Sequence, residues 1–146
     1  MKIFLDTSSL FKLYHQEADT AELQLLFSTI RITGIFLSEI SKIEFTSTIW
    51  KKVRTKEITL SEAERTLDLF ELDFRKYSFV ATDSIIVEQA RILCSKYGTE
   101  GLRTLDSIQL STSLSLFAEV SIFFTSDKLL KSLFEAEGLP TQVGKT

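Results

Sequence analysis

Short apolar runs alternate along the chain with longer stretches of helical periodicity. The apolar runs predict buried strands, and the periodic stretches between them predict helices. The predicted strands cover residues 2–5, 34–37, 79–81 and 120–125, with a further short edge strand at 141–143. The predicted helices cover residues 8–14, 20–30, 38–54, 59–77, 84–97, 104–117 and 126–138. Strands separated by helices throughout favour an α/β fold with a mostly parallel central sheet, a three-layer α/β/α sandwich.

Polar residues at the predicted helix starts are expected to act as N-terminal caps. Ser38, Thr104 and Ser126 each stand at the start of a helical pattern. Thr59 and Glu62 have the spacing of a capping box. Only a few residues separate the helix that Ser38 begins from the helix that Thr59 begins. We therefore expect these two helices to form an antiparallel hairpin.

The length and the composition indicate one domain over residues 1–146, long enough to bury a substantial core. The sequence has no run of 18 apolar residues and no pattern typical of a secretory leader, so we expect a cytoplasmic protein without a membrane segment. The single cysteine, Cys94, cannot form an internal disulfide, and its spacing indicates a small core residue.

The charge balance limits how the protein could meet nucleic acid. A formal net charge of −3 excludes a strongly basic, non-specific nucleic-acid binder, although a local contact remains possible. Twelve phenylalanines and a mean hydropathy of +0.11 are high for a small domain. Either the core is dense, or the long helix pair and the first helices present an apolar surface that another chain covers.

Four acidic residues are placed where the fold could gather them. Asp6 and Asp127 each follow an apolar strand, Asp106 lies in the first turn of its helix, and Glu44 lies about two turns into its own. In open α/β sheets, ligands bind outside the carboxyl ends of the strands. Glu39 is a rival to Glu44, but on a helix the two would be about 140° apart and could not share a face.

The residue types decide which chemistry such a site could perform. One histidine, His15, and one cysteine leave no nitrogen and sulfur site for zinc, so hard oxygen ligands remain. Such ligands suit Mg²⁺, with Mn²⁺ as a substitute, and either ion could activate water for attack on a phosphodiester. In the competing interpretation, Asp106 and Asp127 are ordinary acidic residues at helix N-termini, where the helix dipole favours them.

Hydroxyl and amide side chains near the acids have two interpretations each. Ser8 and Thr125 could donate to the carboxylates or position a water molecule, or they could cap the helix that follows each strand. Gln109 shares a helix face with Asp106. It could contact substrate, but an exposed polar residue is the simpler interpretation.

Basic residues near these positions are candidates for contact with a phosphate backbone. The candidates are Lys51, Lys52, Arg54, Arg103 and Lys128. The first three adjoin Trp50, which could stack on a base. The alternatives are favourable charges at a helix C-terminus for the first three, and salt bridges to the acids for the other two.

Four motifs in order resemble those of PIN-domain proteins, especially the toxin ribonucleases of VapBC toxin and antitoxin pairs. The motifs are residues 3–14, 41–44, 102–111 and 124–130. The resemblance implies a PIN-like fold, a Mg²⁺- or Mn²⁺-dependent endoribonuclease, a homodimer, and a cognate antitoxin that covers the active-site region. It also implies that Asp6, Glu44, Asp106 and Asp127 are the catalytic, metal-binding acids, supported by Thr125.

Two positions depart from the pattern of these relatives. Many relatives have histidine where this chain has Gln109, and a bulky residue is common where it has Ser126. Neither departure removes an acid, so the resemblance still implies activity, and the departures bear on the choice of substrate.

Two other functions are weighed against the nuclease. Phosphoryl transfer on Asp6 would want a second acid two residues later, where this chain has Ser8. A catalytically inactive PIN-like module would use the same groove only to bind RNA or protein. The presence of all four acids disfavours the inactive module.

Overall fold

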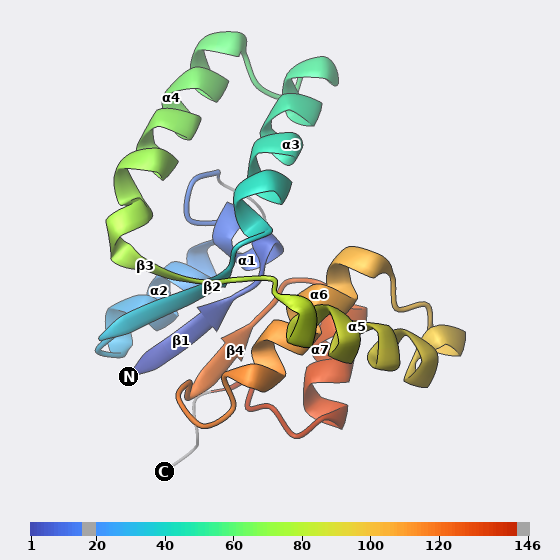
Figure 1. The fold of residues 1–146 in the computed structure, drawn as a ribbon. Helices are drawn as coiled ribbons and strands as arrows, with labels where there is room; N and C mark the ends of the chain where they lie inside the picture. The colour runs from blue at the N-terminus through green and yellow to red at the C-terminus, as the bar shows by residue number, and fades with distance from the viewer. Residues whose placement is uncertain (16–19, 143–146) are drawn as a thin grey trace.

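Four parallel strands form the centre of the protein, seen in a computed structural model that describes residues 1–15 and 20–142 (Figure 1). The strands are β1 (Lys2–Leu5), β2 (Gly34–Ser38), β3 (Tyr77–Val80) and β4 (Ile122–Phe124). They lie in the order β3-β2-β1-β4, and each neighbouring pair is parallel. The α/β class and the parallel sheet predicted from the sequence are confirmed.

Seven α-helices surround the sheet in the described part of the chain. They are α1 (Thr7–Phe11), α2 (Thr20–Thr29), α3 (Ser41–Arg54), α4 (Leu60–Leu72), α5 (Ser84–Lys96), α6 (Thr104–Ser115) and α7 (Lys128–Ala136). Two 3₁₀ turns, η1 (Asp73–Lys76) and η2 (Gly98–Glu100), follow α4 and α5. No described helix combines the length and the apolar character that a membrane span requires.

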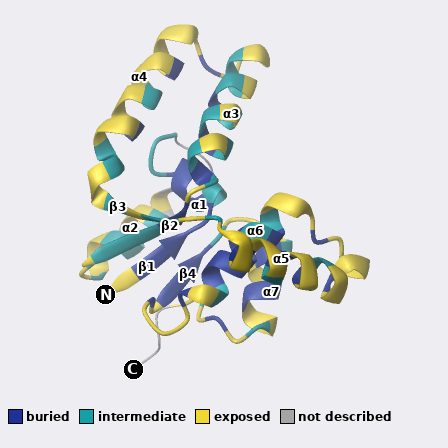
Figure 2. Ribbon diagram, viewed as in Figure 1, coloured by how far each residue is buried: buried dark blue, intermediate teal, exposed yellow. Residues whose placement is uncertain are grey.

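Each face of the sheet has its own apolar core, because side chains of a strand alternate between faces. Ile3 and Leu5 point to the core shared with α1 to α4, whereas Phe4 points to the core shared with α5 to α7. All three side chains are fully buried. Figure 2 shows that β1 and β4 are the most buried strands and that the outer faces of the surrounding helices are exposed. This is the three-layer α/β/α arrangement expected from the sequence.

The phenylalanines bear on the first of the two explanations of the apolar composition, a dense core. All 12 lie in the described part of the chain, and only Phe117 is exposed. Phe4, Phe123 and Phe134 contact one another in one core. In the other core, the rings of Phe45 and Phe70 lie 4.2 Å apart. A dense core therefore accounts for most of the phenylalanine content.

Helices α3 and α4 form the predicted antiparallel hairpin, which projects from one end of the sheet (Figure 1). The N-cap role of Thr59 at its turn is confirmed, since the Thr59 hydroxyl accepts the Glu62 backbone N–H at 3.1 Å, which is half of the predicted capping box. The Glu62 carboxylate accepts a hydrogen bond from that same hydroxyl at 3.0 Å. The prediction that this helix continues to residue 77 was wrong. Tyr77 instead begins β3 and pairs with Ile35 of β2, so the strand also starts earlier than the predicted 79–81.

The three residues predicted to cap helices have other roles in the structure. Ser38 ends β2 and accepts the backbone N–H of Ile40, which precedes α3. Thr104 is the first residue of α6 rather than its cap. Asp127, not Ser126, caps α7, because its carboxylate accepts the Leu130 N–H at 2.7 Å. A carboxylate meeting the positive end of the helix is the better acceptor there.

The predicted edge strand at 141–143 is absent over Thr141 and Gln142, and Val143 lies outside the described residues. The chain meets the sheet one residue earlier, where the Pro140 carbonyl accepts the Phe123 N–H at 2.9 Å. Proline has no N–H to continue the pairing, so the contact ends there.

The order of the strands creates a switch point between β1 and β4. The connection from β1 runs to β2 on one side, and the chain later crosses back to place β4 on the other side. Ligands of open α/β sheets bind in the crevice that such a reversal leaves at the carboxyl ends of the strands. Asp6 follows β1 at this crevice, and its N–H donates to the Phe124 carbonyl that ends β4.

Candidate active site

Asp6 is a buried carboxylate at the centre of the crevice. Its side chain is 3% exposed and caps α1 by accepting the Ser9 N–H at 2.9 Å. Burial raises the pKa of Asp6 to about 6, although hydrogen bonds from Thr125, Ser9 and Ser8 oppose that rise. No lysine or arginine pairs with it in the part of the chain that the structure describes. Such a site favours either a proton or a bound cation.

Ser8 and Thr125 connect Asp6 to the start of α7. The Ser8 hydroxyl donates to both carboxylate oxygens of Asp6, at 2.8 and 2.9 Å, and the Thr125 hydroxyl donates to Asp6 Oδ2. In turn, Ser8 accepts the N–H of Ser126 and Thr125 accepts the N–H of Asp127, both at 3.0 Å. Neither hydroxyl caps a helix. They fix the Asp6 carboxylate relative to the loop that carries Asp127.

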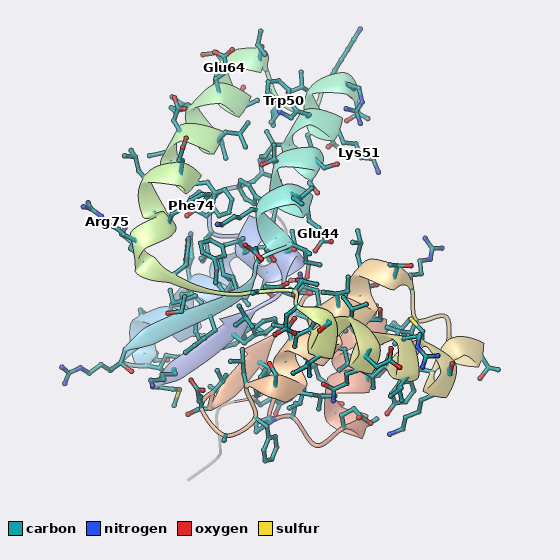
Figure 3. The ribbon with its side chains drawn as sticks, in the orientation of Figure 1. Glu44, Trp50, Lys51, Glu64, Phe74 and Arg75 are labelled. Atoms are coloured by element: carbon teal, nitrogen blue, oxygen red, sulfur yellow. The ribbon has the colours of Figure 1, made fainter. Side chains whose placement is uncertain are left out.

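Glu44 lies in the first turn of α3, since that helix begins at Ser41 rather than at residue 38. Its Oε1 accepts hydrogen bonds from the Thr7 hydroxyl and from Gln109 Nε2, both at 2.9 Å. Thr7 comes from α1 and Gln109 from α6, so three helices meet at this one oxygen. Figure 3 shows Glu44 at the foot of the α3–α4 hairpin, where the hairpin meets the sheet. Its rival Glu39 precedes the helix and is exposed.

Asp106 and Asp127 complete the acidic set. Asp106 lies in the first turn of α6 and is half-buried. Burial raises its pKa, and the charges of Asp127 and Glu44 add to the rise, whereas Arg103 opposes it. Asp127 is exposed and caps α7. Asp106 and Asp127 do lie at helix N-termini, as the competing interpretation predicted. That interpretation does not explain why the acids lie close enough to repel one another.

The four acids line one cleft of about 320 Å³. They come from four segments that are far apart in the sequence, and each lies at the N-terminus of a helix, where the helix dipole favours negative charge. The remaining wall is contributed by Thr7, Ser8, Phe11, Thr48, Lys52 and Gln109. The gathering of these acids, which their sequence spacing alone could not establish, is a property of the fold.

Among the predicted basic residues, Lys52 alone lines this cleft. Its Nζ forms an ion pair with Glu57 at 3.2 Å and lies over the Phe11 ring, and the side chain is 19% exposed. Lys51 and Arg54 are exposed on the same helix. Lys51 is seven residues beyond Glu44, hence on nearly the same helix face, as Figure 3 shows.

The positions of Arg103, Lys128, Trp50 and Cys94 can now be compared with the roles that the sequence suggested. Arg103 and Lys128 are exposed, and neither forms an ion pair with the acids in the described part of the chain. Trp50 is half-buried and packs against the core between α3 and α4 (Figure 3), so its ring is not the exposed stacking platform that the sequence suggested. Cys94 is half-buried and has a free thiol.

The donor set of the cleft fits a hard divalent cation. It offers carboxylate and hydroxyl oxygens, and a cation would offset both the burial of Asp6 and the repulsion around Asp106. Within residues 1–15 and 20–142, no three acidic, histidine or cysteine side chains stand close enough to hold one ion together. Mg²⁺ needs only one or two carboxylates with water and substrate oxygens, so Asp6 and Asp106 or Asp127 would suffice.

Gln109 is the residue that the sequence analysis misjudged most. It was expected to be exposed, but only 2% of it is accessible, and its amide contacts Thr7, Ser41 and Glu44. Ser41 was not considered for the site. Helical spacing gives only part of this role, since Ser41 is three residues before Glu44 and Gln109 three after Asp106, so each shares a helix face with an acid. The contact of Gln109 with Glu44 depends on how α3 and α6 pack together.

Three solved structures resemble this protein in fold. VapC20 of Mycobacterium tuberculosis, a toxin that cleaves the sarcin-ricin loop, superposes with a TM-score of 0.69 at 15% identity over 94% of this chain and 95% of that chain. VapBC2 of Rickettsia felis bound to a promoter DNA fragment gives 0.62 at 14% identity over 97% and 98%. VapBC of Salmonella typhimurium bound to DNA gives 0.52 at 16% identity over 77% and 79%.

The sequence itself gives a family match. No curated protein matches it significantly. The PIN domain, however, matches residues 3–133, which include all four acids and all of the sheet except Lys2, the first residue of β1. With the parallel sheet, the crevice beside β1 and the structural likeness to VapC proteins, this match establishes the family. The chain belongs to the PIN domain family.

Proposed function

We propose that this protein is a Mg²⁺-dependent endoribonuclease, for which Mn²⁺ can substitute, and the toxin of a toxin–antitoxin pair. The observation that supports the proposal most is that carboxylates from four separate segments line one cleft at the switch point of a PIN-domain sheet. Asp6 is buried and has no basic partner among the described residues, so a bound cation would stabilise its ionised form.

In this proposal the acids divide the work. Asp6, Asp106 and Asp127 hold the cation directly or through water, and Glu44 holds it or orients the attacking water. Bound there, the cation would neutralise phosphate charge and activate a water molecule for attack on the phosphodiester. Ser8 and Thr125 keep the Asp6 carboxylate in place through the hydrogen bonds described above.

Lys52 is the basic residue best placed to meet the substrate. Lys52 lines the cleft with the acids, and its ammonium group forms an ion pair with the exposed Glu57. A substrate phosphate could replace Glu57 as the partner of this ammonium group. Lys51 is exposed on the same helix, about 100° around from Lys52. Arg103 and Lys128 are exposed at the starts of α6 and α7. With a net charge of −3, the protein would rely on such local contacts for RNA binding.

The toxin role and its partners rest on similarity. Two of the similar structures are complexes of toxin and antitoxin, which supports a cognate antitoxin for this chain. VapC20 is a toxin that cleaves the sarcin-ricin loop. A homodimer and a cytoplasmic location belong to the same proposal. Exposed aliphatic side chains on α5, among them Ile85 and Ile92, offer an apolar surface for a protein partner.

Cleavage of a mixed RNA pool tests the proposal directly. Purified protein is incubated with Mg²⁺, with Mn²⁺ and with EDTA, beside the variants Asp6→Asn and Asp83→Asn. Asp83 is the matched control, because it caps α5 as Asp6 caps α1 but does not line the cleft. Metal-dependent cleavage that is lost in Asp6→Asn and kept in Asp83→Asn is expected. Cleavage that survives in Asp6→Asn would overturn the site.

A catalytically inactive RNA- or protein-binding module is the second candidate. One observation favours it, since no three of the described acids already stand at liganding distance of one point. If the wild-type protein neither cuts RNA nor binds Mn²⁺ at millimolar concentration, this candidate replaces the nuclease.

A further inference from the structure

We infer that Gln109 is a positioning residue. It fixes Oε1 of Glu44 by a hydrogen bond, so that Oε2 of Glu44 can bind an ion, a water molecule or substrate in the cleft. The inference rests on the proposed role of Glu44 in catalysis. Gln109 lines the cleft but is only 2% exposed, so it acts through Glu44 rather than on RNA.

The amide of Gln109 is held by three oxygen atoms. Its Nε2 donates to Glu44 Oε1 at 2.9 Å and lies 3.1 Å from both the Thr7 and the Ser41 hydroxyl oxygens. The Thr7 hydroxyl also contacts Ser41 at 2.9 Å and donates to Glu44 Oε1. Glu44 Oε1 therefore receives two donors, from α6 and from α1. Its Oε2 accepts no hydrogen bond from any described residue and is left for an ion, a water molecule or substrate.

The unpaired Oε1 of Gln109 indicates what this arrangement serves. That oxygen is buried and has no hydrogen-bond partner among the described residues. Turning the amide by 180° would place Oε1 beside the hydroxyls of Thr7 and Ser41, both of which can donate to it. It would also place Oε1 against the Glu44 carboxylate, where two oxygen atoms repel each other. The observed orientation satisfies Glu44 and leaves a buried acceptor unpaired, a departure that native proteins keep where function requires it.

This geometry predicts a specific division between binding and catalysis. Groups that orient a ligand of the reacting centre typically change activity about 10- to 100-fold when removed. We expect Gln109→Leu, which has a similar volume and no donor, to lower kcat by about that factor with KM unchanged. Gln109→His retains a ring N–H that can donate to Glu44, and it is expected to recover part of kcat. Gln89→Leu, on α5 outside the cleft, is the matched control and should leave both constants unchanged.

A second measurement tests the contact itself and needs no RNA. In protein labelled with ¹⁵N-glutamine, the Gln109 side-chain amide protons should exchange with water far more slowly than those of exposed Gln24. In Glu44→Ala the acceptor is gone and the turned amide becomes favourable, so the exchange of these protons should accelerate. If exchange is unaffected by Glu44→Ala, or if Gln109→Leu changes KM rather than kcat, the inference is wrong. If the wild type does not cut RNA but the exchange result holds, the proposed function fails and the contact stands.

Discussion

The burial of Asp6 gives the site its dependence on pH. The folded-state pKa of about 6 lies above the ordinary 3.8, so the folded protein takes up a proton between these values that the unfolded chain does not. The free energy of unfolding contributed by this group therefore falls as the pH rises from 3.8 to about 6, and then levels off. Above pH 6 the metal-free protein carries the full cost of an ionised, buried carboxylate.

Asp6→Asn is expected to stabilise the metal-free protein at pH 8. A pKa difference of about two units corresponds to roughly 3 kcal/mol, which is the upper limit of the gain because asparagine cannot accept every hydrogen bond that Asp6 receives. Urea unfolding in EDTA, at pH 8 and at pH 4, measures the difference between the variant and the wild type. The gain should shrink toward zero at pH 4. An equal difference at both pH values would mean that the charge of Asp6 is not the cause.

The ammonium group of Lys52 should report on the path of the RNA. If it contacts phosphate, Lys52→Met will weaken RNA binding for all sequences and reduce the salt dependence of log K by about 1. Lys2→Met is the control, since Lys2 is exposed at the start of β1, the opposite end of the strand from Asp6. Binding is measured with a catalytically inactive Asp106→Asn protein over a range of salt. Equal slopes for Lys52→Met and Lys2→Met would remove Lys52 from the substrate path.

At the scale of elements, two site acids also hold helices in place. Asp127 caps α7 through Leu130 N–H, and Asp6 caps α1 through Ser9 N–H. Asparagine caps a helix about as well as aspartate, whereas alanine does not. Asparagine variants therefore separate the loss of charge from the loss of a helix cap.

Asp127→Ala should lower the free energy of unfolding by about 1 kcal/mol, and Asp127→Asn should leave it nearly unchanged. Both variants should lose RNA cleavage. Chemical denaturation compares them with Ser126→Ala, the adjacent exposed residue, which is not expected to change stability. If Asp127→Asn loses as much stability as Asp127→Ala, the charge of the carboxylate, and not its role as a cap, stabilises α7.

The hairpin of α3 and α4 depends on its internal aromatic contact. Phe70 is 2% exposed and packs on Phe45, so Phe70→Ala should cost about 3 to 5 kcal/mol of stability. Leu72→Ala, on the same helix but 67% exposed, should change stability by no more than about 0.5 kcal/mol. Similar losses in the two variants, measured by thermal or chemical unfolding, would contradict this description of the core.

The sequence predicts the presence of the helices and strands more accurately than it predicts their ends. Apolar runs and helical periodicity located all four strands and the helices between them, because burial on one or both faces imposes a pattern on the chain. The cap of α7 was assigned one residue early, at Ser126, because a hydroxyl and a carboxylate compete for the same role. The end of α4 was missed because β3 begins where Tyr77 pairs with Ile35, a contact that no local pattern records.

At the scale of the whole molecule, the site is a consequence of strand order. The order β3-β2-β1-β4 brings Asp127 beside Asp6, although 121 positions separate them in the numbering. Strand order depends on contacts between distant segments, which the sequence pattern does not reveal by itself. The acids could be nominated from their positions after strands and in helix turns. The buried role of Gln109 and the entry of Lys52 into the cleft could not, since both depend on how α1, α3 and α6 pack together.

Diffraction from Mn²⁺-soaked crystals tests most directly whether the acidic cleft holds a divalent cation. Anomalous scattering locates manganese independently of any assumption about RNA. We expect a manganese peak in the cleft within bonding distance of Asp6 and of Asp106 or Asp127, and we expect this peak to be lost in crystals of Asp6→Asn. No peak at saturating Mn²⁺, or a peak elsewhere on the protein with the cleft empty, would contradict the account.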